Sequence, residues 1–241
     1  MSYEAWGTFH IITLICPIVL ILLLYFILKN KELKFKKIFL FTFSLIGVIC
    51  ILIDMFYRIE LLWYNLPFHL CTLTGIIIPI VILTQNKYLG NLILLWSLGA
   101  LGALIFNLSE TDLYTYNLDL WLYFLPHLIE VSLPITLILL KMIKFDFKTI
   151  PSTLLITFIA YTFAHILNYT YNTYSTNEIG ILSNFMFSYT HENNPFLLIL
   201  YSLCPYRYFY MLLLFPFILL FLIILYLPQI IKKYNIKEKL S

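Results

Sequence analysis

The sequence has very few charged residues for its length. Of 241 residues, 15 are Lys or Arg and 12 are Asp or Glu, so that 11% of the chain is charged and 62% is hydrophobic. Soluble domains usually carry about 25% charged residues, because a solvated surface needs them. This shortage excludes a soluble globular enzyme, a disordered protein and a nucleic-acid-binding module. It predicts an all-α, polytopic helix bundle in the cell membrane.

Motifs for cofactors and metals are also missing. The chain contains no P-loop, no GxGxxG, no HExxH and no GxSxG sequence. Its four cysteines show no CxxC or other spacing typical of a metal site: Cys16, Cys50, Cys71 and Cys204. We therefore expect no cofactor and no metal, and we expect membrane lipids rather than nucleic acid as partners.

Long apolar runs are what the sequence does contain. Crossing about 30 Å of hydrocarbon takes about 20 apolar residues, and lipid leaves helices as the only way to satisfy the backbone of such a run. Seven runs qualify, at residues 8–28, 38–57, 66–84, 88–107, 119–140, 149–171 and 207–231. The chain is therefore predicted to be a single membrane domain, 1–241, of seven spans. A further apolar stretch at 196–203 fits an interfacial or re-entrant segment.

Lysine is distributed on one side of the predicted spans. All 13 Lys fall in the first, third and fifth connections and in the C-terminal tail, at 29–37, 87, 141–148 and 232–239. Seven spans place these four segments on the same face, and the positive-inside rule makes that face cytoplasmic. The prediction is an outer N-terminus and a cytoplasmic C-terminus.

Ionisable residues inside the predicted spans are the exceptions to the apolar pattern. Such residues cost several kcal/mol when they face lipid, so they normally face the bundle interior and mark a site. At about 1.5 Å per residue, all of them fall toward the outer half of the bilayer. They are Asp54, His69, His127, Glu130 and His165, with Arg58 and Arg207 near span ends.

This level of the membrane could support nucleophilic chemistry. Cys71 lies at the start of the third span, where free N–H groups and the helix dipole favour a thiolate. His127 is the candidate base, and Glu130, one turn further along, is its candidate orienting partner. His69 and His165 could contact an oxyanion or leaving group. Arg58 and Arg207 could hold a lipid phosphate, and Asn168 is a further candidate for substrate binding.

Other interpretations of the same residues remain open. A transporter or small-molecule-binding protein would use this polar cluster as a proton or ligand site, and a non-catalytic subunit would use it only to join helices. Cys71 could be an inert core residue or could form a disulfide with Cys204. Asp54 and Arg58, four residues apart, could pair with each other.

The run Leu66-Pro67-Phe68-His69-Leu70-Cys71 resembles the opening of the third span in the bacterial YwaF-like integral membrane family. The resemblance continues through residues 94–106, 124–127 and 168–169, and ends near 205–206. It implies a small multi-helix membrane protein. The eukaryotic relatives of that family are regarded as phospholipid acyltransferases that use a Cys and a His, and the resemblance puts these roles on Cys71 and His127.

The sequence departs from the family pattern before the fifth span. The family has a Pro-His-Phe run there, whereas this chain has Tyr116-Asn117-Leu118. Either the missing histidine weakens the enzyme interpretation, or Asn117 makes a neutral contact in its place. The sequence thus predicts an acyltransferase or lipid hydrolase that acts on a lipid acyl ester by a Cys–His mechanism. It leaves the substrate and the oligomeric state open.

Overall fold

The computed structural model describes residues 6–57, 66–106, 118–144, 146–174, 182–192 and 194–238, and side chains up to residue 231. All regular elements in these ranges are helices, which confirms the all-α prediction. The chain divides into two compact units, Met1–Ile143 (unit 1) and Lys144–Ser241 (unit 2). That the two together form a single membrane domain stays a prediction.

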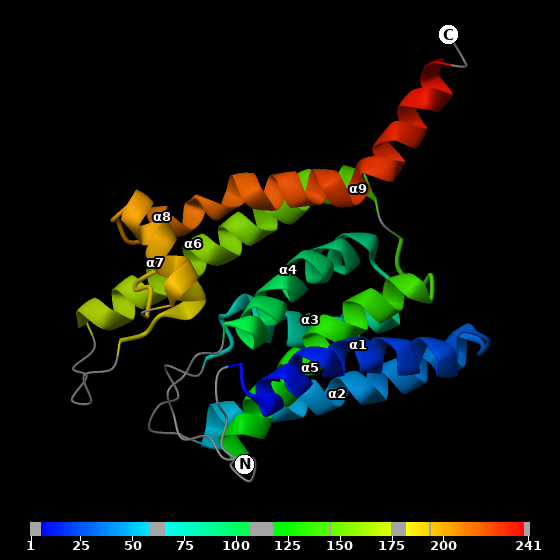
Figure 1. The fold of residues 1–241 in the computed structure, drawn as a ribbon, viewed down its shortest axis with the longest axis horizontal. Helices are drawn as coiled ribbons and strands as arrows, with labels where there is room; N and C mark the ends of the chain where they lie inside the picture. Colours follow the sequence, from blue (N-terminus) through cyan, green and yellow to red (C-terminus); the bar gives the residue numbers. More distant parts are fainter. Residues whose placement is uncertain are drawn as a thin grey trace. The chain divides into compact units, whose positions relative to one another are not determined.

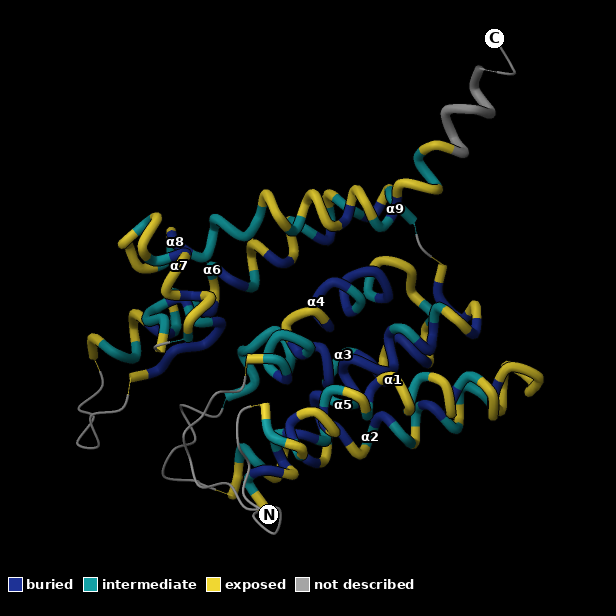
Figure 2. The backbone as a smooth tube through the Cα atoms, in the orientation of Figure 1, coloured by how far each residue is buried: buried dark blue, intermediate teal, exposed yellow. Residues whose placement is uncertain are grey.

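Unit 1 is a bundle of five helices built around the last of them. Its elements are α1 (Thr8–Leu28), α2 (Leu33–Tyr57), α3 (Leu70–Thr84), α4 (Lys87–Ile105) and α5 (Leu118–Leu139) (Figure 1). Helix α5 packs against each of the other four. It is the most buried helix of the bundle, whereas the outer faces of α1 and α2 are rows of exposed apolar residues (Figure 2). Those rows suit contact with lipid tails.

Helix α3 begins four residues later than the predicted span. Pro67 disfavours a helical residue before it and has no N–H to donate. The chain at His69 is accordingly extended (φ −80°, ψ 149°) and caps the helix that follows. Fifteen residues cover about 22 Å, which is less than the hydrocarbon thickness.

The lysine-bearing connections of unit 1 meet at one end of its bundle. The turn between α3 and α4 uses Gln85 in the left-handed conformation (φ 53°), and the Asn86 side chain caps α4. Lys37 Nζ donates to the Leu83 carbonyl at 2.8 Å, and Gln85 Nε2 donates to the Met142 carbonyl at 3.3 Å. The first, third and fifth connections therefore share an end, as a cytoplasmic face requires.

Unit 2 consists of two long helices and a short helical segment between them. Its elements are η2 (Phe147–Thr149), α6 (Ile150–Tyr174), η3 (Phe185–Phe187), α7 (Pro195–Leu203), α8 (Phe209–Leu212) and α9 (Leu214–Glu238). The apolar stretch at 196–203 forms α7, which has nine residues and is too short to cross a membrane. Helices α6 and α9 contact each other and both contact η2.

Six helical segments of the described chain are long and apolar enough to cross a membrane, and α3 is the shorter apolar helix beside them. The protein is therefore a multi-pass membrane protein. Seven complete spans and the outside–inside orientation stay predictions.

Candidate functional site

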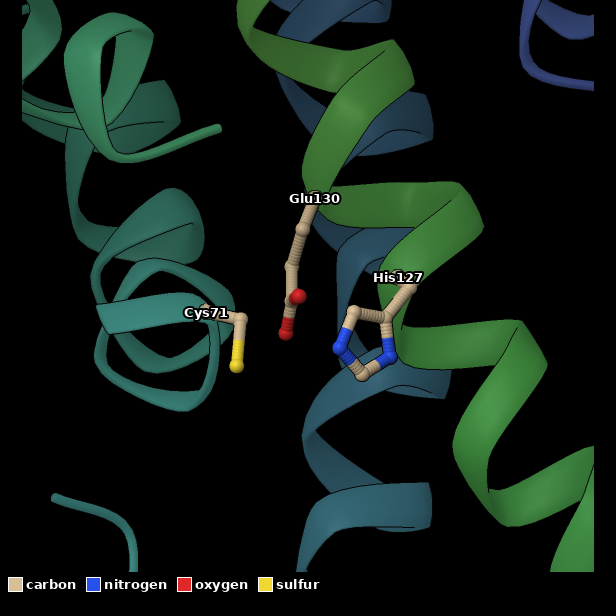
Figure 3. Close-up of side chains that lie close together, drawn as sticks. All are labelled: Cys71, His127 and Glu130. Carbon is tan, nitrogen blue, oxygen red and sulfur yellow. The ribbon is translucent and has the colours of Figure 1, made fainter. Parts of the chain in front are cut away.

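Three of the predicted site residues lie together inside unit 1. Each of Cys71, His127 and Glu130 offers a sulfur, nitrogen or oxygen atom to a cluster in which these atoms all lie within 4.8 Å of one another. Cys71 comes from α3, and the other two come from α5, which packs directly against it. Figure 3 shows the thiol and the carboxylate facing each other, with a ring nitrogen of His127 turned toward both.

Cys71 lies in the first turn of α3. The N-cap residue His69 makes no side-chain hydrogen bond to this turn, so its first N–H groups have no partner within the helix. The thiol is half-buried and packs beside an apolar cluster that includes Ala100, Leu104 and Phe124. Its sulfur lies 3.8 Å from the Thr72 hydroxyl oxygen.

The hydrogen bonding of His127 defines its tautomer. Its Nδ1 lies 2.6 Å from the Tyr123 backbone carbonyl, which can only accept, so Nδ1 carries the proton. In the neutral ring Nε2 then holds a lone pair. The Tyr123 ring lies against the imidazole with centroids 4.4 Å apart, which holds the ring in place. His127 therefore presents a base or metal-ligating nitrogen to the cluster.

Glu130 is the most deeply buried member of the cluster. It is 1% exposed, and its Oε2 has no hydrogen-bond partner among the described residues. Gly75 of α3 makes room for it, since a Cβ on Gly75 would lie 2.8 Å from Glu130 Oε1. A buried carboxyl oxygen without a hydrogen-bond partner lowers the stability of the fold. The presence of Glu130 here therefore indicates a role other than stability.

Prolines interrupt both helices at this level. Pro79 in α3 and Pro134 in α5 have no N–H, so the carbonyls of Gly75 and Glu130, four residues earlier, lose their helical donors. Both open turns border the cluster.

Helix length gives the depth of the cluster. Helices α3 and α5 both end at the lysine-bearing end of unit 1. At about 1.5 Å per residue, Cys71, His127 and Glu130 lie about 20, 18 and 14 Å from that end. Cys71 and His127 thus lie beyond the middle of a 30 Å hydrocarbon layer, and Glu130 lies close to the middle.

The other predicted residues fall elsewhere. His69 is the half-buried N-cap of α3, and Asp54 lies in the last turn of α2. Arg58 and Asn117 lie outside the described residues. His165, Asn168 and Arg207 belong to unit 2. All four cysteines are free thiols, so the disulfide considered from the sequence is not formed.

The three residues of unit 2 belong to a polar network around the segment that includes η3. The Asn168 amide is fully buried and donates to the Phe185 carbonyl and the Ser188 hydroxyl. Its oxygen accepts from Ser183 Oγ and from the Phe185 N–H. All four hydrogen-bonding positions of this amide are used within unit 2.

His165 and Arg207 lie nearer the surface of unit 2. His165 Nδ1 donates to the Ser188 carbonyl at 3.1 Å. Arg207 is exposed, with its guanidinium 4.1 Å above the Tyr189 ring. The predicted roles of these residues and of Asn168 in substrate binding stay predictions.

His10 is a structural residue that the sequence analysis did not single out. It is fully buried in α1, accepts a hydrogen bond from the Trp6 N–H at Nδ1 and donates from Nε2 to the Leu104 carbonyl. It joins α1 to the end of α4. The signal available was a histidine in a run of hydropathy 3.1, the most apolar of the chain.

Comparison with known proteins gives one match. No curated protein and no solved structure matches the chain. The sequence matches the TMEM164 family over residues 5–226, which covers all five helices of unit 1 and most of unit 2. The narrower YwaF-like resemblance stays a prediction. With that coverage, the chain belongs to the TMEM164 family of transmembrane proteins.

Proposed function

We propose that this membrane protein is an enzyme that transfers or hydrolyses a lipid acyl chain, with Cys71 as nucleophile and His127 as base. The observation that carries the proposal is the cluster of a thiol, an unprotonated imidazole nitrogen and a buried carboxylate at one depth of an apolar bundle. Ionisable groups are retained at such a depth chiefly for function.

The reaction has two steps. The Cys71 sulfur attacks the ester carbonyl, and His127 Nε2 takes the thiol proton and returns it to the departing alcohol. A thioester on Cys71 results. An acceptor hydroxyl, from a second lipid or from water, then gives its proton to His127 and attacks the thioester, which restores the free thiol. Transfer and hydrolysis differ only in that acceptor.

The surroundings supply charge stabilisation. The N–H groups in the first turn of α3, which have no carbonyl partner within the helix, can donate to the oxyanion that forms beside Cys71. The Tyr123 carbonyl orients His127 through Nδ1, so Glu130 takes a different role from the orienting one expected. Its carboxylate stabilises the imidazolium that exists while His127 holds the proton. His69, at the N-cap, is the further candidate for contact with the oxyanion.

We assign recognition of the lipid headgroup to Arg207 and Arg58. Arg207 holds an exposed guanidinium against an aromatic ring, a geometry that leaves its N–H fork available to a phosphate. Arg58 follows the last residue of α2 in sequence. His165 is the remaining candidate for substrate contact in unit 2, whereas the Asn168 amide, whose four hydrogen-bonding positions are all used there, has a structural role.

A transport function has less support. Proton or ion transfer needs polar groups that continue from the cluster toward the lysine-bearing end. The next buried hydroxyls of α5 are Ser132 and Thr136, and they donate to the carbonyls of Pro17 and Ser132. These bonds join helices and stiffen α5, and they form no chain of exchangeable partners.

The test is a turnover assay on the purified full-length protein in lipid nanodiscs. The probe is a diacyl phospholipid with an isotopically labelled acyl chain, followed by mass spectrometry for loss of the acyl chain and for a labelled thioester on Cys71. The wild type is expected to give both signals. Cys71→Ser and His127→Ala are expected to give neither.

A matched control comes from the same bundle. Cys50 is a buried thiol of α2 outside the cluster, and Cys50→Ala is expected to keep wild-type turnover. Full turnover in both Cys71→Ser and His127→Ala would exclude the mechanism. Acyl label recovered on Cys16, Cys50 or Cys204 rather than Cys71 would do the same.

A further inference from the structure

We propose that Cys71, His127 and Glu130 also bind one Zn²⁺ ion, and that the bound ion reversibly inhibits the acyl chemistry; the inhibitory half rests on the function proposed above. This differs from the expectation of no metal drawn from sequence spacing. His127 and Glu130 follow Cys71 by 56 and 59 residues in the sequence. Ligands so far apart form no short motif, so their spacing could not reveal the site. The fold brings them together.

The donor set matches zinc. Zinc takes thiolate, imidazole and carboxylate ligands, and sites with three protein ligands leave a fourth position open. The donor atoms lie within 4.8 Å of one another, and a tetrahedral zinc holds its ligands about 3.3–3.8 Å apart, by bond lengths of about 2.0–2.3 Å. Small side-chain rotations close that difference. The sulfur and nitrogen ligands favour zinc over magnesium or calcium.

Each ligand is oriented for coordination. The His127 Nδ1–H is held by the Tyr123 carbonyl, which leaves Nε2 as the ligand atom and supplies the outer hydrogen bond that metal-bound histidines usually have. Glu130 Oε2 is buried without a hydrogen-bond partner among the described residues. It is an acceptor already held away from water, and a cation is the partner that best offsets its burial.

Charge also favours the ion. A thiolate and a carboxylate together carry two negative charges, and one Zn²⁺ makes the group neutral. Neutrality is what an apolar bundle tolerates, because unpaired charge in a low dielectric is costly. On binding, the S–H bond of Cys71 breaks, the S–Zn bond forms, and the thiol proton is released to solvent.

Zinc would inhibit the acyl reaction because it would bind the same two atoms that the reaction uses. The Cys71 sulfur lone pair and the His127 Nε2 lone pair are the two that the acyl reaction uses. When both coordinate zinc, neither can attack the ester nor accept its proton. Removal of the ion returns both.

The test uses Co²⁺ as a spectroscopic substitute for zinc on the purified full-length protein. One equivalent of Co²⁺ is expected to give a near-ultraviolet thiolate-to-cobalt charge-transfer band, and Zn²⁺ is expected to remove it by displacement. The band is expected to be absent in Cys71→Ala, to require roughly tenfold or more Co²⁺ in Glu130→Gln, and to be unchanged in Cys50→Ala. In the turnover assay, Zn²⁺ is expected to stop the wild type and a chelator to restore it.

The outcomes separate the two proposals. A missing band, or a band that survives Cys71→Ala, would overturn the metal site whatever the turnover. A normal band with turnover untouched by Zn²⁺ would overturn the inhibition. Metal-free protein that forms no acyl thioester would overturn the proposed function, and the cobalt band in wild type and variants would still decide the metal site.

Discussion

The two units bury polar side chains in opposite ways. In unit 2, the Asn168 amide uses all four of its hydrogen-bonding positions on the segment 183–188. In unit 1, Glu130 Oε2 has no hydrogen-bond partner among the described residues, and His127 offers a ring nitrogen to the same cluster. A completed network stabilises a fold, whereas an incomplete one in an apolar interior lowers stability and is retained for another reason. The difference supports the proposal that the cluster in unit 1 is the functional site.

The largest expected effect is a loss of activity when the cluster of Cys71, His127 and Glu130 is mutated. His127→Ala removes the proposed base and should lower turnover of the labelled phospholipid about 10²–10⁴-fold. The free energy of unfolding should change little by comparison. The control is His191→Gln, since His191 stacks on Tyr201 in unit 2 and is given no role in the reaction. Equal losses in both variants would contradict the assignment.

Mutation of the Asn168 network in unit 2 should instead change mainly the stability of the protein. Asn168→Leu leaves the Phe185 N–H and the hydroxyls of Ser183 and Ser188 without their partner, and should lower the free energy of unfolding by about 2–4 kcal/mol. Thermal unfolding in nanodiscs measures this. Asn172 is half-buried and its bonds to described residues go to the Ser183 backbone, so it provides a graded comparison: Asn172→Leu should cost about half as much. A neutral Asn168→Leu would mean that the network is not structural.

The close approach of Gly75 on α3 to Glu130 predicts a third, smaller effect, on stability. A Cβ on Gly75 would lie 2.6 Å from Ile51 Cδ1 and 2.8 Å from Glu130 Oε1. Gly75→Ala should therefore cost about 1–3 kcal/mol and displace the carboxylate. Gly102 has nothing within 4 Å of the same position, so Gly102→Ala should stabilise α4 by about 0.5–1 kcal/mol. Thermal unfolding of the two variants should shift in opposite directions.

The smallest stability change is expected at the most buried carboxylate. Glu130→Leu replaces an incompletely bonded group with an apolar one of similar size, so the free energy of unfolding should stay within about 1 kcal/mol of wild type or rise. Turnover should fall, because the imidazolium loses its counter-charge. A loss as large as that of Asn168→Leu would remove the contrast between the two clusters.

Parts of this arrangement were predictable from the sequence. Apolar runs predicted the helices, and helix rise alone placed Cys71, His127 and Glu130 at similar depth. Their proximity depends on α3 packing against α5, which no local pattern encodes. Pro67 was visible, but its effect of starting α3 at Leu70 rather than 66 follows from backbone geometry. The tautomer of His127 depends on a backbone carbonyl, which leaves no trace in residue type.

The unit 2 residues were harder to interpret. His165 and Asn168 lie on α6. The sequence predicted that His165 shares the outer level with Glu130, and it made Asn168 a candidate for substrate binding. Whether an amide is saturated or open depends on the partners supplied by residues 183–188. Those partners are ordinary serines and backbone groups that carry no motif. A side chain's hydrogen-bonding state, unlike its depth, cannot be read from spacing.

The buried hydrogen bond between His10 and Leu104 constrains the order in which the helices can assemble during synthesis. The two residues are 94 positions apart. At a synthesis rate of about 5–20 residues per second, α1 waits about 5–20 s in the membrane before its carbonyl partner exists. The hydrogen bond from the Trp6 N–H to the imidazole is, by contrast, local in sequence. Helix α1 is synthesised before α4, and its contact with Leu104 forms only once α4 has been inserted.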